Sequence, residues 1–241
     1  MYYMCTYVHP WGVCIILDMA SRKYPFVTNC YYHIFNRGVN RESIFNDKID
    51  NIRFINLLKF YNSVEYPIRF SKFMLLSFDQ RKEIWGRINK SQKYLDIISY
   101  SLMPNHFHLL IKQNIDRGIT IFLSNFQNGY TKYFNTKYSR DGHLFQGPFK
   151  AVKIDSEEQL LHVSRYIHLN SYSSGIVKNI TDLNNYEWAS FPEYISNLPF
   201  EICNKEIILS NFKNKQGYKN FVYDNADYQK KFEEIKHLVA E

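Results

Sequence analysis

The chain has 241 residues, is 45% hydrophobic and carries a formal net charge of +7. This length fits one generous domain of α/β type, or a core domain with an appendage. The charge indicates an anionic partner, of which nucleic acid is the commonest, or simply a soluble basic protein. Aromatic residues form 17% of the chain and favour nucleic acid, because rings stack on unpaired bases while Lys and Arg meet phosphates.

Cysteine spacing and hydropathy exclude several classes of protein. The four cysteines are scattered without a Cys-x-x-Cys pair, which argues against a zinc knuckle or disulfide framework and favours a reducing cytoplasm. No segment is predicted to span a membrane, and the apolar run 11–17 lacks the basic start of a signal peptide. Residues 1–18 contain no Lys or Arg, whereas Met19 begins a sequence typical of a protein start. We therefore predict that residues 1–18 are a non-native or disordered leader.

The hydropathy pattern predicts short strands that alternate with helices. In chain order we expect a strand over 30–36, a helix from about 47, a strand over 68–78, a polar loop or insertion over 79–93, a strand carrying residues 106–111, a helix over 118–138, a strand over 149–154 and a helix from 156 to about 171. This order predicts an α+β fold with helices packed on one face of an antiparallel sheet. We expect this domain to span 19–195, followed by a mostly helical C-terminal extension over 196–241.

The most informative segment is His106-Phe107-His108, which runs into the apolar residues Leu109 to Ile111. Side chains alternate between the two faces of a strand, so both imidazoles are predicted to leave the same face. Such a pair can form half of a metal site. It can equally be the polar, partly solvated face of a sheet, and the spacing alone does not decide between them.

The predicted helix that begins at Ser156 presents a second set of polar residues. His162, Tyr166 and Asn170 recur every four residues and therefore line one stripe of that helix. Two imidazoles and the Asn170 oxygen can ligate one divalent cation, with the Tyr166 phenol reaching a phosphate bound to it. The alternative is that Tyr166 is an ordinary packing residue and Asn170 caps the C-terminus of the helix.

Several ordered motifs carry a resemblance to a known family. They are Tyr32-His-Ile-Phe-Asn-Arg-Gly38, Leu102-Met-Pro-Asn-His-Phe-His-Leu-Leu110, Gly142-His-Leu-Phe-Gln-Gly147 with Phe149-Lys150, Tyr166-Ile-His-Leu-Asn170 and Tyr186-Glu-Trp-Ala-Ser190. Together they resemble the REP-associated tyrosine transposases, a branch of the single-tyrosine HUH endonucleases related to insertion-sequence transposases. The resemblance covers roughly residues 22–195.

The resemblance implies a ferredoxin-like or RRM-like sheet, the HUH endonuclease fold. It implies that His106, His108 and Asn170 bind a divalent metal, Mg²⁺ or Mn²⁺, and that Tyr166 is the catalytic nucleophile; the ligand types alone also suit zinc. Asn105 is expected to position His106. The chain departs from the family after Asn170, where Ser171-Tyr-Ser-Ser-Gly175 stands in place of Pro and a basic residue.

The predicted function is therefore that of a metal-dependent single-stranded DNA endonuclease and strand transferase, which cleaves near hairpins through a 5′-phosphotyrosine. Arg37, Lys150 and Lys153 are the cations nearest these motifs and are predicted to contact DNA phosphates. The expected partner is single-stranded DNA with a REP-like hairpin, bound by a monomer or homodimer in the cytoplasm at the nucleoid, without a membrane.

Two other functions stay open at this point. One is a domesticated relative that binds nucleic-acid hairpins without cutting them. The other is a metal-dependent hydrolase in which His106 and His108 activate water, which leaves Tyr166 without a role. Among the remaining histidines, His162 can assist proton movement or be a solvated helix residue, and His168 is predicted to be structural; we assign no chemistry to His33 or His143.

Overall fold

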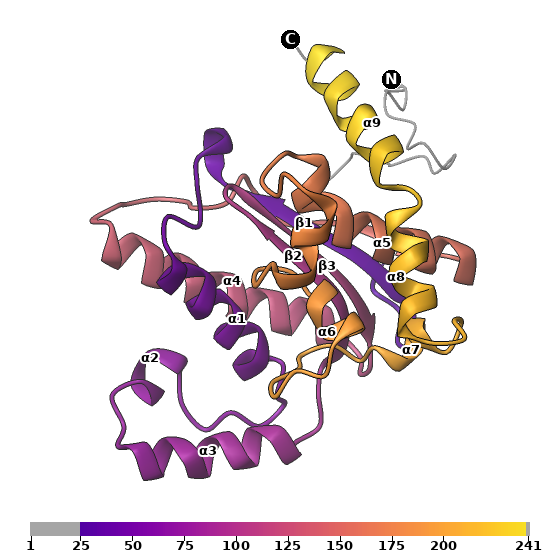
Figure 1. Cartoon of the computed structure of the whole chain (residues 1–241). Coiled ribbons are helices and arrows are strands. Elements are labelled where there is room, and N and C mark those ends of the chain that lie inside the picture. Colours follow the sequence, from indigo (N-terminus) through magenta and orange to yellow (C-terminus); the bar gives the residue numbers. More distant parts are fainter. Residues whose placement is uncertain (1–24, 240–241) are drawn as a thin grey trace.

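The computed structural model describes residues 25–239, and side chains up to residue 232, so the predicted leader over 1–18 lies outside the described residues. A four-stranded antiparallel sheet runs through the centre of the molecule, in the order β2-β3-β1-β4 (Figure 1). Its strands are β1 (Tyr31–Arg37), β2 (Leu95–Met103), β3 (His106–Gln113) and β4 (Lys150–Ile154). This arrangement confirms the predicted α+β class and places the histidine strand inside the sheet.

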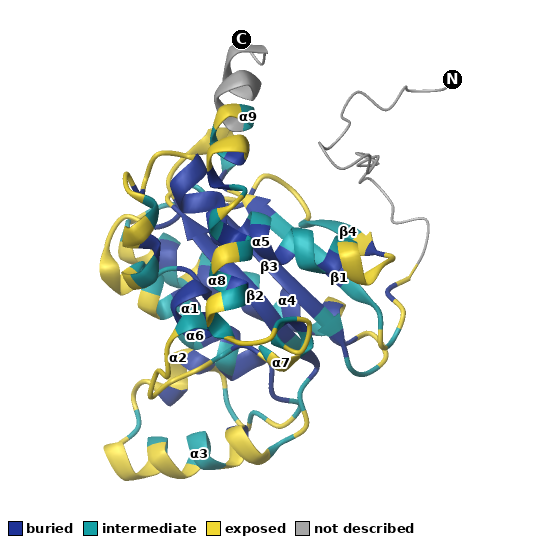
Figure 2. Ribbon diagram, turned by 45° about the vertical axis from the view of Figure 1, so that its right-hand side comes forward, coloured by how far each residue is buried: buried dark blue, intermediate teal, exposed yellow. Residues whose placement is uncertain are grey.

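Two helices, α1 (Lys48–Tyr61) and α4 (Gly118–Lys137), pack on one face of the sheet. Phe54 of α1 lies between them and the strands, with its ring centroid 5.0 Å from that of Phe107 and 4.5 Å from that of Phe126. These fully buried rings form the centre of the core. In Figure 2 the central strands β2 and β3 are coloured mostly as buried. Both helices confirm the prediction for this face.

The prediction of helices on one face leaves out α5 (Glu157–Ser173), which lies over the other face, mainly across β2 (Figure 1). Its start agrees with the helix predicted from 156, and the Ser156 side chain caps it by accepting a hydrogen bond from the backbone of Gln159. Gly175, in the left-handed conformation at φ 76°, follows the end of the helix. β2 and β3 are consequently buried from both sides.

The C-terminal segment is mostly helical, as expected, and packs around α5. It contains α6 (Phe191–Ile195), α7 (Glu206–Leu209), α8 (Lys215–Tyr223) and α9 (Ala226–Val239). Before α6, a short 3₁₀ helix (Ile180–Asn185) leads to a segment that covers the edge of β2, where Leu102 donates to the Trp188 carbonyl and Ser190 donates to the Tyr100 carbonyl. Covering an edge strand in this way removes unpaired backbone groups. No described helix has the length and hydropathy to span a membrane.

Two predicted elements between β1 and β2 are wrong. The expected strand over 68–78 is instead the helix α2 (Phe70–Phe73) and the start of α3 (Phe78–Lys90), and the expected polar loop over 79–93 is α3 itself. A capping box between Ser77 and Gln80 begins α3, since each side chain bonds the other's backbone nitrogen. The helix is mostly exposed, with Ile88 its one buried residue, which explains its polar sequence (Figure 2).

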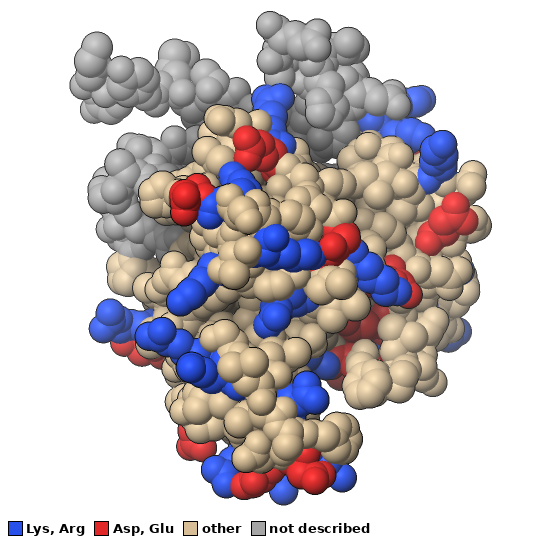
Figure 3. Space-filling view, turned by 90° about the vertical axis from the view of Figure 1, so that its left-hand side faces the viewer, with Lys and Arg blue, Asp and Glu red and all other residues tan. Residues whose placement is uncertain are grey.

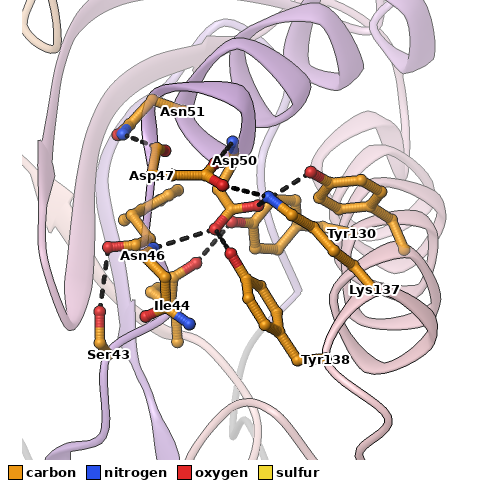
Figure 4. Close-up of polar contacts among 11 residues, drawn as sticks. Ser43, Ile44, Asn46, Asp47, Asp50, Asn51, Tyr130, Lys137 and Tyr138 are labelled. Atoms are coloured by element: carbon orange, nitrogen blue, oxygen red, sulfur yellow. Dashed lines mark hydrogen bonds and ion pairs between the residues drawn. The ribbon is translucent and has the colours of Figure 1, made fainter.

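A buried carboxylate joins α1 to α4 (Figure 4). Asp50 is fully buried and accepts hydrogen bonds from the Lys137 ammonium at 2.7 Å, from the Tyr138 hydroxyl at 2.8 Å and from the Asn46 backbone at 2.9 Å. The Tyr133 hydroxyl also donates to it, at 2.8 Å. Burial alone raises the pKa of Asp50, but these hydrogen bonds outweigh it, so that the pKa lies below its ordinary value. The cluster therefore holds an ionised carboxylate inside the helical layer.

Candidate functional site

The two histidines of β3 lie side by side on the face of the sheet that α5 covers. The ring centroids of His106 and His108 are 5.0 Å apart, with the rings nearly perpendicular. Pairing with β1 places Arg37 opposite His106 and Phe35 opposite His108, so these side chains share the same face. The prediction that both imidazoles leave one face is confirmed.

His106 is a neutral imidazole with one nitrogen committed to a neighbour. Burial, and then the charge of Arg37, lower the pKa of His106 to about 4. Its Nδ1 lies 2.7 Å from the Asn105 side-chain oxygen, a contact that the sequence predicted. Because that oxygen can only accept, Nδ1 carries the proton and Nε2 presents a lone pair. His106 is thus prepared to act as a ligand through Nε2.

His108 is oriented by a third histidine, His33 of β1. The His33 Nε2 and the His108 Nδ1 are 2.9 Å apart, and the two rings stack with centroids at 5.1 Å. When His108 donates through Nδ1, its Nε2 carries the lone pair, and the two β3 histidines then present the same type of donor. We assigned no chemistry to His33 from the sequence. Its position in the same face as His108 depends on strand register, which the Tyr32–Gly38 motif does not reveal.

Tyr166 reaches this face from α5. Its half-buried ring meets His108 at a centroid distance of 5.8 Å and His33 at 6.1 Å, edge-on in both cases. The backbone of α5 is fixed at this point by Gln229 of α9, whose amide donates to the Tyr166 carbonyl at 3.1 Å. The structure therefore brings together a phenol and histidines that are more than fifty residues apart in the sequence.

Asn170 lies one helical turn after Tyr166 and is 6% exposed. Its amide nitrogen has no hydrogen-bond partner. Because α5 continues to Ser173 and is capped at Ser174, Asn170 is not the C-cap, and that alternative is wrong. A buried amide without a partner is costly, and a ligand on this side would relieve the cost.

The donor atoms of His106, His108 and Asn170 are of types that bind divalent cations. Within residues 25–232, no three His, Cys, Asp or Glu side chains gather as a metal site, so the third donor must be of another type. Rotation of the Asn170 amide puts its oxygen where the unpaired nitrogen lies. Two imidazoles and a carboxamide then form a mixed nitrogen and oxygen set that suits Mg²⁺, Mn²⁺ or zinc.

Comparison with known proteins finds one matching family model. Residues 76–170 match the family model described as "Transposase IS200 like", a span that contains β2, β3, α4, β4 and α5 as far as Asn170. Over these residues the chain is similar to IS200-like transposases. No curated protein matches the sequence.

Two solved structures are similar to this chain at low identity. One is a REP-associated tyrosine transposase bound to a REP hairpin, at 14% identity and a TM-score of 0.46, covering 77% of this chain and 90% of that one. The other is a candidate transposase from Deinococcus radiodurans R1, at 13% identity and a TM-score of 0.34, covering 62% of this chain and 95% of that one.

The structure separates the three cations that were predicted to contact DNA. Arg37 lies on the histidine face and donates to the Gln146 side chain, and Lys150 of β4 lies on the same face, opposite Phe35. Lys153 lies on the other face of β4 and forms an ion pair with Asp155 at 2.7 Å. Arg37 and Lys150 thus flank the candidate site, and Lys153 does not.

The two histidines of α5, His162 and His168, have identifiable contacts. His168 is fully buried, with its ring nitrogens 2.8 Å from the Ser190 hydroxyl and 2.7 Å from the Tyr218 hydroxyl, and burial lowers its pKa to about 3. This contact pattern confirms the predicted structural role of His168. His162 accepts a hydrogen bond from Arg165 at 2.8 Å on the surface of the helix.

Proposed function

We propose that this protein is a transposase, a metal-dependent single-stranded DNA endonuclease and strand transferase, which cleaves DNA next to hairpins through a 5′-phosphotyrosine at Tyr166. One observation carries the proposal: the Tyr166 ring lies against His108 although the two residues come from different elements. A phenol beside a pair of imidazoles places a nucleophile next to a site that can hold a phosphate-binding cation. No other described tyrosine ring contacts the β3 histidines.

The proposed reaction exchanges a phosphodiester of the DNA backbone for a phosphodiester between DNA and Tyr166. The Tyr166 phenol loses its proton, and its oxygen forms a bond to the scissile phosphorus. The bond from phosphorus to the 3′-oxygen breaks, and that oxygen takes up a proton to leave a free 3′-hydroxyl. The 5′-phosphate remains attached to Tyr166, so the bond energy is kept for rejoining to another strand without ATP.

The surrounding residues perform positioning and charge neutralisation. His106, His108 and Asn170 would hold Mg²⁺ or Mn²⁺, which when bound offsets negative charge on the scissile phosphate oxygens. Arg37 and Lys150 would bind phosphates of the strand that crosses this face. An unperturbed phenol has a pKa of about 10, so little of the reactive phenolate is present at neutral pH. Alignment of the Tyr166 phenol with the phosphate by a rigid helix therefore contributes much of the rate.

The proposed partner is a single strand with a REP-like hairpin. Support comes from the ordered motifs, which resemble those of REP-associated tyrosine transposases, and from the net charge of +7. We propose that the protein acts on nucleoid DNA as a monomer or homodimer. Binding of hairpins without cleavage and metal-dependent hydrolysis are the two competing functions.

The test is formation of a covalent adduct. Wild type is incubated with Mn²⁺ and a pool of hairpin oligonucleotides that carry randomised single-stranded flanks. A 3′ label stays with the protein, because the 5′ end of the downstream fragment becomes attached to it. We expect an adduct that resists sodium dodecyl sulfate in wild type, its loss in Tyr166→Phe, and its retention in Tyr228→Phe, a control at an exposed tyrosine.

Each competing function gives a different outcome in the same assay. Retention of hairpins without cleavage would replace the proposal by the non-cleaving relative. Cleavage that leaves free fragments at every time point, and that persists in Tyr166→Phe, would replace it by the hydrolase. Neither outcome is compatible with Tyr166 as nucleophile.

A further inference from the structure

A large groove lies on the opposite side of the sheet from Tyr166. It has a volume of about 1330 Å³ and runs between α1, the α2–α3 insertion and the segment over 184–202. Tyr100 of β2 lines this groove, whereas the next residue, Ser101, pairs with His108. Because neighbouring residues of a strand point to opposite faces, the groove and the candidate catalytic site lie on either side of the edge strand β2.

The insertion that forms one wall has a net charge of +5, against +7 for the whole chain. Its residues 69–93 contain seven basic and two acidic residues. Figure 3 shows one face of the molecule, with Lys and Arg side chains from its centre down to its lower end, where Asp and Glu side chains stand among them. Arg81 and Lys82 of α3 line the groove, as does Lys59 of α1.

Two of the basic side chains of the groove, Arg81 and Lys82, have no described acidic side chain beside them, whereas Lys59 feels the charge of Glu193. Among residues 25–232, no carboxylate lies within ion-pair distance of Arg81 or Lys82. Glu193 turns its carboxylate to the backbone nitrogens of Ile202 and Cys203, and Glu187 is paired with Lys48. The groove therefore presents a net positive potential to an anionic ligand.

Exposed rings stand on both walls of the groove. Phe78 at the start of α3 is 71% exposed, and Phe200 on the facing segment is 80% exposed, with the Lys59 ammonium 5.9 Å from its centroid. Trp85 lines the groove between them and packs on Phe73, with centroids 5.7 Å apart. Aromatic rings interleaved with unpaired cations are the arrangement that binds single strands, since bases stack while phosphates meet charge.

We propose that this groove is a second site for single-stranded DNA, which holds the strand that flanks the hairpin while the other face carries out cleavage. The inference rests on the proposed function for its substrate class. Phe78 and Phe200 would stack on bases, and Arg81 and Lys82 would bind phosphates. The groove thus adds affinity for unpaired strand without contributing a residue to the reaction.

The charge contacts are tested by salt dependence. Binding of a fluorescent oligothymidylate to Tyr166→Phe is measured by anisotropy at several salt concentrations, so that cleavage does not interfere. The added double change Arg81→Gln/Lys82→Gln is expected to reduce the slope of log K against log salt by about 1.4, since each phosphate contact on a single strand contributes about 0.7. The control Arg87→Gln/Lys90→Gln removes the same charge from the same helix outside the groove and should leave the slope unchanged.

The stacking contacts are tested by Phe78→Ala and Phe200→Ala, which alter exposed rings and leave the core intact. Each is expected to weaken binding about fivefold or more at an unchanged salt slope. Equal reductions of the salt slope in Arg81→Gln/Lys82→Gln and in its control would overturn the proposal. A groove variant that alters the oligomeric state of the protein without altering DNA binding would overturn it as well. An adduct from wild type without these groove effects refutes only the groove, whereas groove effects without an adduct refute only the proposed cleavage.

Discussion

Replacing His33 tests whether this side chain prepares His108 for a cation. In His33→Phe, the His108 Nδ1 loses the acceptor that lies 2.9 Å away. His108 is 6% exposed, so water cannot readily take its place. Without a cation the ring can move its proton to Nε2, but with a cation on Nε2 the proton stays on Nδ1, which has lost its hydrogen bond to residue 33. A buried donor without a partner costs about 1–3 kcal/mol.

This cost falls on the cation-bound state and therefore lowers affinity. At about 1.4 kcal/mol for each factor of ten, we expect Mn²⁺ to bind His33→Phe about 5- to 150-fold more weakly. Isothermal titration calorimetry measures the change directly. His33→Gln, whose amide oxygen can reach the place of Nε2, should restore most of the affinity, and His143→Phe, at an exposed histidine, should not alter it. Unchanged affinity in His33→Phe, at an unchanged melting temperature, would refute the reasoning.

Two further predictions concern stability and DNA binding. Asp50→Asn should lower the free energy of unfolding by about 3 kcal/mol, measured by urea titration, against little change for Lys48→Ala at an exposed ion pair. Because the pKa of Asp50 is lowered in the folded state, this stabilisation is complete above about pH 4 and disappears as pH falls through the folded pKa. A difference in unfolding free energy between wild type and Asp50→Asn that stays constant down to pH 2 would contradict this prediction. Arg37→Gln should reduce the salt slope of hairpin binding by about 0.7–0.9, and Lys153→Gln, on the other face, should not; equal slopes would show that the histidine face does not meet DNA.

Helices and strands with a clear periodicity of apolar residues could be predicted from the sequence. The helices over 118–138 and from 156 have apolar stripes and a recognisable cap at Ser156, and both are confirmed. The strand of 149–154 is confirmed by β4. Local patterns determine these elements, so their tertiary surroundings were not needed.

Elements whose pattern depends on tertiary contacts could not be predicted. β2 is buried on both faces because α5 covers the second one, so its sequence shows no alternation. The run over 68–78 is apolar because the rings of Phe70 and Phe73 pack on Phe60, which a short apolar run cannot reveal as helical. The polar α3 lies at the surface, and the Ser77–Gln80 capping box was the signal that could have identified it.

The sequence predicted how the candidate site residues are placed within each strand or helix. Strand parity placed His106 and His108 on one face, and helical spacing placed Tyr166 and Asn170 on one stripe. Register between β1 and β3 decided the rest, because it brings His33 and Arg37 to that face and leaves Lys153 on the other. A single sequence does not reveal strand register, so His33 was missed and Lys153 was grouped with the wrong neighbours in space.

The most direct test of the central claim is to locate the nucleotide on the protein. After reaction of wild type with the hairpin pool and digestion of the DNA, mass spectrometry of tryptic peptides should find a nucleotide adduct in the peptide over 166–178. Fragmentation distinguishes the two tyrosines of that peptide, Tyr166 and Tyr172. The account predicts the adduct on Tyr166, whose ring lies at the histidines. An adduct on Tyr172, on another residue, or on none would contradict it.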